Sequence, residues 1–315
     1  MNVIFGSGIV GMLAKVILGP SWKVIPFYRS RFFSFNPALD DNFIVKNVAI
    51  DPFIKDLVGH AGHPMIYSRA WSIGGHIVKN YNKELLATWS HKVFGYDVPT
   101  QVEPYFNSKM TSTIYDIRVN QLYQTLCNRY AEEIKAETAL GPITEIGDHY
   151  YVRNNVKEEF DHAVNTIPLP QFNKLAGYES KVKAKTVHYL HIETEDLNFE
   201  GHNQLMVVDE HFGFYKVTNI APKRYLFYCH EDLVNPGVYM MQFMNKFDII
   251  DGTSIQDVIP SGQIPKLDYL ENKGIYSVGS AAQWDWCMDV GSCIIRLLKY
   301  AQNGYGATKP KIIKI

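Results

Sequence analysis

The chain has 315 residues, of which 46% are hydrophobic and 20% are charged, a composition typical of a globular protein with a large core. The formal net charge of −1 argues against a protein that binds nucleic acid through its overall charge, and no apolar run reaches the roughly 18 residues that a membrane span needs. The four cysteines form no CxxC pair, which predicts reduced thiols in a cytosol-like compartment.

The first predicted unit is a strand over residues 2–5 followed by a helix over about 9–18, with glycines spaced as GxGxxG between them. This order is typical of a dinucleotide-binding turn. The first glycine makes the tight turn, the second lets the backbone approach a pyrophosphate, and the third lets the helix pack on the strand. The N–H groups at the helix N-terminus would bind the phosphates. The alternative is a glycine-rich turn without a ligand. The predicted cofactor-binding run is Gly6, Ser7, Gly8, Ile9, Val10 and Gly11.

A second strand, Trp22 to Phe27, completes a compact βαβ unit. In NAD-type units an acidic residue ends this strand and binds the ribose. No acid follows here before Asp40, so Tyr28 or Arg29 is expected to pack against the adenosine instead.

Residues 34–110 show only short periodic segments. His60 and His63 have a metal-ligand spacing, but they stand in a Gly/Pro loop without an obvious third ligand, so no metal site is predicted. His76 is a candidate for capping the pocket of the site.

The middle of the chain alternates between helical and strand patterns. A helix is predicted over about 119–134, a hairpin over 143–152, and a strand over 160–166 that ends in a proline-rich segment. The helix is predicted from apolar residues at four-residue spacing: Leu122, Leu126, Tyr130 and Ile134.

Residues of about 180–250 alternate β-branched and aromatic side chains, which predicts a mostly antiparallel sheet. The last elements are a strand over 274–279, a loop over 280–288 and a helix over 289–300. Asp289 is the predicted N-cap of that helix.

This order of elements resembles the FAD-dependent oxidoreductases that include the amine oxidases and UDP-galactopyranose mutase. Three stretches carry the resemblance: residues 6–11, residues 160–170, and residues 274–289, where a strand ends in glycine and a second helix N-terminus would point at the flavin. Ser280 stands where that family often has arginine.

The resemblance implies an α/β fold with a Rossmann-like FAD-binding domain around a central parallel sheet and a smaller, mainly antiparallel substrate domain. The FAD-binding domain would comprise residues 1–50, 111–175 and 265–315, and the substrate or cap domain residues 51–110 and 176–264.

The resemblance also implies FAD as the cofactor, which would supply the redox chemistry. Only one of Tyr215 and Lys216 is expected to point inward, because side chains alternate along a strand. The further cofactor-binding residues would be Thr166, Gly279, Ser280, Trp284, Met288 and Asp289. The catalytic candidates are Tyr215, Lys216, Trp284 and His76.

The function expected first is transfer of a hydride from a substrate carbon, one bonded to nitrogen as in an amine or amino acid, to flavin. Three alternatives stay open: a non-redox mutase-like flavoenzyme, a compact phage-type flavoenzyme acting on amino-acid-modified thymine in DNA, and a scaffold like the GDP-dissociation inhibitors. The expected partner is a small molecule or modified nucleotide, with no membrane. Nucleic acid is not favoured by the net charge. The expected location is the cytoplasm, that of the host for a phage protein, and the oligomeric state is left open.

Overall fold

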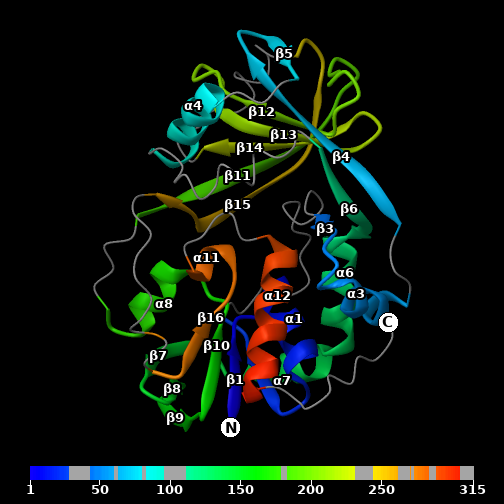
Figure 1. Ribbon diagram of the computed structural model, residues 1–315. Helices are drawn as coiled ribbons and strands as arrows, with labels where there is room; N and C mark the ends of the chain where they lie inside the picture. The colour runs from blue at the N-terminus through cyan, green and yellow to red at the C-terminus, as the bar shows by residue number, and fades with distance from the viewer. Residues whose placement is uncertain are drawn as a thin grey trace.

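The computed structural model describes residues 1–27, 43–59, 63–79, 83–95, 111–178, 183–230, 244–261, 270, 273–283 and 289–305. Within these residues the chain forms a parallel sheet with its helices, in the lower half of Figure 1, and a large mixed sheet in the upper half. This arrangement confirms the predicted α/β fold class.

The parallel sheet has four strands in the order β16-β10-β1-β2, and each neighbouring pair is parallel. Val3, Ile4 and Phe5 are fully buried, as expected for a parallel strand that is covered on both faces. The strands are β1 (Asn2–Phe5), β2 (Trp22–Ile25), β10 (His162–Asn165) and β16 (Ile275–Ser277).

Two apolar cores cover the faces of this sheet. Ile4 belongs to a core formed largely by helices, whereas Val3 and Phe5 pack on the other face against a small antiparallel sheet and a short helix. The helices of the first core are α1 (Ile9–Leu18), α3 (Asp51–Val58), α6 (Val119–Arg129), α7 (Ala131–Ala139) and α12 (Val290–Tyr300). The other face carries β7 (Ile143–Gly147), β8 (Tyr150–Arg153), β9 (Val156–Glu159) and α8 (Leu169–Leu175).

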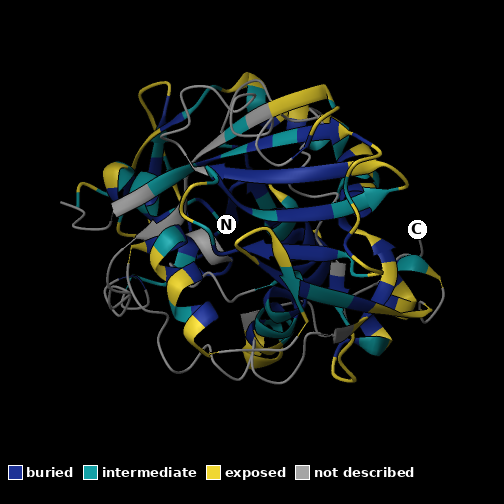
Figure 2. Cartoon of the chain, turned by 90° about the horizontal axis from the view of Figure 1, so that it is seen from above, coloured by how far each residue is buried: buried dark blue, intermediate teal, exposed yellow. Residues whose placement is uncertain are grey.

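The large sheet has nine strands in the order β15-β11-β14-β13-β12-β4-β6-β3, with β5 paired to β4. Its pairs are antiparallel except for β12 with β4, as expected for a mainly antiparallel sheet. Its buried strands cross the view from above in Figure 2. The strands are β3 (Phe43–Val45), β4 (Pro64–Ile73), β5 (His76–Val78), β6 (Thr111–Arg118), β11 (Lys183–Glu193), β12 (Gln204–Val207), β13 (Phe214–Ala221), β14 (Arg224–His230) and β15 (Asp248–Ser261).

The predicted helix over 119–134 is divided in two at Tyr130. That residue has φ −106° and ψ 18°, which lie outside the helical region, so α6 ends before it and α7 begins after it. Leu122, Leu126 and Ile134 are nonetheless all buried in the first core, as their spacing predicted.

The predicted domain boundaries stay a prediction. α3 lies in the segment expected in the cap, and its buried residues pack in the same core as α1. β6 lies in the segment expected in the FAD-binding domain, and it pairs with β4 in the large sheet.

Lys92 joins helix α4 (Lys83–Phe94) to the large sheet through hydrogen bonds. Its ammonium group donates to the carbonyl oxygens of Val207 at 3.2 Å, Asp209 at 2.5 Å and Phe214 at 2.8 Å. Burial lowers the pKa of Lys92 from 10.5 to about 8, against the opposing attraction of Asp209. The folded protein therefore holds a charge that is costly to bury at neutral pH.

We expect this cost to give a measurable pH dependence. Because the folded pKa lies below the unfolded value, Lys92 penalises the folded state fully below pH 8, and the penalty is relieved as pH rises toward 10.5. The free energy of unfolding of the wild type, minus that of Lys92→Met, should rise by up to about 3 kcal/mol across this window. Urea titrations at several pH values measure the difference, and a value independent of pH would contradict the expectation.

Candidate functional site

The glycine turn between β1 and α1 has the geometry that its spacing predicted for the first and third glycines. Gly6 has φ +100°, a conformation that favours glycine, and its N–H donates to the Ile25 oxygen at 2.9 Å. A Cβ on Gly11 would lie 2.1 Å from the Gly6 oxygen. Gly6 therefore makes the turn, and Gly11 permits the close approach of helix and strand.

Gly8 is different, because its surroundings are open. It is exposed, its backbone is extended (φ −68°, ψ 179°), and a Cβ built on it meets nothing within 4 Å. Gly8 is also the N-cap of α1, and no side chain caps that helix N-terminus. The space beside Gly8 and the N–H groups of the first turn fit an anionic group such as a pyrophosphate.

The neighbouring strand β10 supports this turn. The Thr166 hydroxyl donates to the Phe5 oxygen at 2.8 Å, and a Cβ on Gly6 would lie 2.5 Å from Thr166 Oγ1. Asn165 is fully buried, and its side chain accepts from the Ile167 N–H at 2.9 Å. Thr166, predicted as a cofactor ligand, thus uses its hydroxyl proton to hold the end of β1.

A second helix N-terminus lies at the same edge of the parallel sheet. α1 and α12 both begin at the end of the sheet that faces the large sheet (Figure 1). Asp289 caps α12, as predicted, by accepting the Ser292 N–H at 2.6 Å. This cap uses one of the N–H groups that were expected to face the flavin.

Gly279, which follows β16, lies close to the first turn of α1. It has φ +121°, and a Cβ on it would lie 3.8 Å from Val10 Cγ2 in the first turn of α1. The predicted loop over 280–288 contains a short helix, α11 (Ser280–Gln283), whose Gln283 N–H donates to the Gly279 oxygen at 2.9 Å. Four predicted residues lie outside the described part of the chain, and the Ser280 side chain is likewise not described. The four residues are Tyr28, Arg29, Trp284 and Met288.

A β-bulge in β13 changes the expected roles of Tyr215 and Lys216. The pairing with β14 shifts register between Phe214 and Lys216, so the strict alternation of side chains is broken there. The Tyr215 ring lies 6.1 Å from that of Tyr228, and the Lys216 ammonium lies 3.6 Å from the same ring. Both side chains therefore lie on the face of the sheet that carries Tyr228, whereas strict alternation would have placed them on opposite faces. Their catalytic roles stay a prediction.

His76 stands apart from the glycine turn. It begins β5, pairs with Ile73 and is exposed. β5 lies at the far end of the large sheet from α1 in Figure 1. The structure therefore does not bring this catalytic candidate to the turn.

Tyr123, on α6, is a residue of the site that sequence reasoning missed. Its hydroxyl donates to the Ser7 carbonyl oxygen at 3.0 Å. Burial raises the pKa of Tyr123, so the hydroxyl keeps its proton. No local signal marks this residue, because its partner lies 116 positions away.

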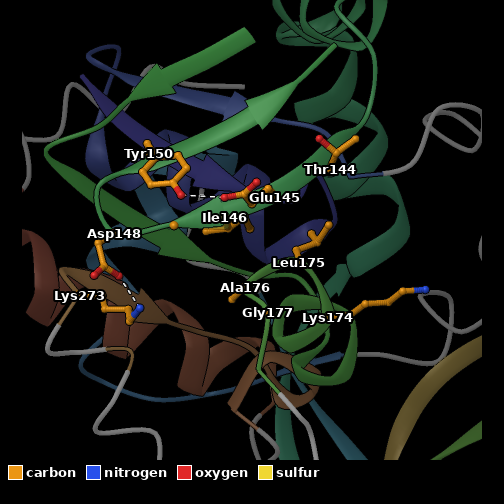
Figure 3. A pocket seen from close by; sticks show the side chains of 11 residues that line it. Thr144, Glu145, Ile146, Asp148, Tyr150, Lys174, Leu175, Ala176, Gly177 and Lys273 are labelled. Carbon is orange, nitrogen blue, oxygen red and sulfur yellow. Dashed lines mark hydrogen bonds and ion pairs between the residues drawn. The ribbon is translucent and has the colours of Figure 1, made fainter. Parts of the chain in front are cut away.

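A surface pocket of about 500 Å³ lies between the β7–β8 hairpin and the C-terminal end of α8, and no residue of the glycine turn lines it (Figure 3). Lys273, in its wall, lies two residues before the amino end of β16, whereas open α/β sheets bind ligands at the carboxyl ends of their strands. Two pairs of its lining residues bind one another: Lys273 with Asp148, and the Tyr150 hydroxyl with Glu145 at 2.7 Å. This pocket is therefore a weaker candidate than the glycine turn.

Two further properties concern only the described residues. No group of three or more His, Cys, Asp or Glu side chains there is arranged to hold a metal ion, and His60 lies outside these residues. No helix in the same residues is both long and apolar enough to cross a membrane.

No protein-family model and no curated protein sequence matches the chain. Solved structures match it over nearly its whole length. Reduced UDP-galactopyranose mutase has a TM-score of 0.66 at 12% identity, covering 99% of this chain and 95% of the mutase. Cyclohexylamine oxidase from Brevibacterium oxydans IH-35A has a TM-score of 0.65 at 10% identity, covering 96% of this chain and 98% of the oxidase. The chain therefore has the fold of UDP-galactopyranose mutase and cyclohexylamine oxidase, as its motifs predicted.

Proposed function

We propose that the chain binds FAD at the turn between β1 and α1 and acts as a flavin-dependent oxidoreductase. The observation that carries this proposal is Gly8, which is exposed, has no atom near its missing side chain and begins an uncapped helix. These properties suit a pyrophosphate bound end-on to α1. The fold shared with cyclohexylamine oxidase and UDP-galactopyranose mutase supports the same reading.

Different elements of the chain would bind different parts of the cofactor. The first turn of α1 would bind the pyrophosphate, and Gly279 with the start of α12 would lie along the flavin end. When bound, FAD supplies an acceptor for the two electrons and one proton that leave an oxidised C–H bond. We propose a carbon bonded to nitrogen as the site of oxidation and a free small molecule as the substrate.

Purified protein is expected to be yellow and to release FAD, not FMN, on denaturation. The open space at Gly8 is the reason, because FMN has no pyrophosphate to place there. Absorbance between 350 and 500 nm and chromatography of the released flavin measure this. A colourless protein that cannot be reconstituted with FAD would exclude the proposal and favour the scaffold alternative.

The reaction class is tested separately on the flavin-loaded protein. An amine substrate should bleach the flavin under anaerobic conditions, and oxygen should restore its absorbance. Turnover of a substrate without consumption of an electron acceptor would instead favour mutase chemistry. For DNA as substrate, affinity should fall steeply with salt, with a slope of roughly −0.9 per phosphate contact. An affinity that is independent of salt would favour a free small molecule.

A further inference from the structure

We propose that Tyr123 is a positioning residue for the dinucleotide, because its hydroxyl holds the Ser7 carbonyl and thereby sets the direction of the Gly8 N–H. This inference rests on the proposed function. The hydrogen bond of 3.0 Å joins α6 to the glycine turn, 116 residues earlier in the chain. It is a contact to the backbone of the site and not to its side chains.

The geometry of the peptide unit makes this contact consequential. The Ser7 carbonyl and the Gly8 N–H belong to one peptide group, and no cis peptide bond occurs in the described chain. In a trans peptide the C=O and N–H bonds point in opposite directions. With its oxygen held toward α6, this peptide directs the Gly8 N–H away from α6, and the space in which a Cβ on Gly8 would lie is free of atoms within 4 Å.

The surroundings of Tyr123 keep it a donor. The side chain is half-buried on α6, and the hydrogen bond that its hydroxyl makes is the one to the Ser7 oxygen. Burial raises the pKa of the phenol, so its proton is retained at neutral pH. The Ser7–Gly8 peptide is thus fixed before any ligand arrives, which lowers the entropic cost of binding.

Tyr123→Phe tests the proposal, since it removes one hydroxyl and keeps the ring. Apoprotein of the variant should bind FAD about 3- to 10-fold more weakly than the wild type, a loss typical of one hydrogen bond. ADP, which contains a pyrophosphate but no flavin, should lose affinity by the same factor. Fluorescence quenching measures FAD binding, and calorimetry measures ADP binding.

Tyr225→Phe is the matched control. Tyr225 is a buried tyrosine of the large sheet, and its hydroxyl also donates to a backbone carbonyl, that of Leu197, at 2.8 Å. This variant should lose thermal stability but keep wild-type affinity for both ligands. If Tyr123→Phe melts like the control and also keeps both affinities, Tyr123 is merely structural and the inference is overturned. If the wild type itself binds no FAD, the proposed function has failed instead.

Discussion

Replacing Gly8 with valine is expected to abolish FAD binding while leaving the protein folded. The backbone of Gly8, at φ −68° and ψ 179°, is one that valine adopts readily, and its Cβ would meet no atom within 4 Å. The new side chain therefore occupies only the space assigned to the pyrophosphate. We expect a loss of affinity of at least about 100-fold, measured by titrating apoprotein with FAD.

Gly11→Ala is the contrasting variant from the same motif. Its Cβ would lie 2.1 Å from the Gly6 oxygen, which is a backbone atom, so helix and strand would have to move apart. We expect this variant to lose stability in urea, whereas Gly8→Val should unfold near the wild-type midpoint. Retention of flavin at wild-type stoichiometry by Gly8→Val would overturn the assignment of the turn.

Replacing Arg153 with leucine is expected to destabilise the protein by about 3 kcal/mol, because buried Glu137 and half-buried Glu158 lose the guanidinium and keep only Lys23, at 3.0 and 3.6 Å. Arg153 is 2% exposed and binds Glu137 at 2.6 Å and Glu158 at 2.5 Å. Tyr151 also donates to Glu158, at 2.7 Å. These contacts join α7 to β8 and β9, so their loss loosens the packing beside the parallel sheet.

Lowering the pH should reduce the loss of stability that Arg153→Leu causes. Although burial opposes it, hydrogen bonds from Arg153 and Tyr151 lower the pKa of Glu158 below its usual value of 4.5. The stability that Glu158 contributes is therefore present above pH 4.5 and is lost as pH falls through the lowered pKa. Lys135→Met is the control, since Lys135 pairs with Glu132 on the exposed face of α7 and should change stability by no more than about 0.5 kcal/mol. Equal urea midpoints for the two variants would contradict the expectation.

Several elements with local signals were predicted to within a residue or two. The first strand and helix were predicted over residues 2–5 and 9–18, and the structure has the same bounds. Asp289 was predicted as an N-cap, and its carboxylate accepts the Ser292 N–H. In each case the signal, a glycine turn, an apolar run or a capping side chain, lies within a few residues of the structure that it determines.

Features that depend on distant partners were not predicted. The bulge at Tyr215 arises from pairing between β13 and β14, and the sequence of β13 alone does not predict it. The contact of Tyr123 with Ser7 likewise depends on how α6 packs against α1. β9 was missed despite a local signal, the pair Asn154 and Asn155, because asparagine is common in two-residue hairpin turns. In the structure both residues have positive φ, as a type I′ turn requires.

The order of strands in the parallel sheet has a consequence for synthesis on the ribosome. β1 ends at Phe5, but its neighbour β10 begins at His162 and the edge strand β16 ends only at Ser277. At roughly 5 to 20 residues per second, about 15 to 55 s separate the first strand from the last. The apolar residues of β1 and α1 must be shielded during that interval, by chaperones or by transient contacts within the nascent chain. A ligand whose site extends from the glycine turn to Gly279 and α12 can therefore stabilise the finished protein, but it cannot guide the folding of the segments made first.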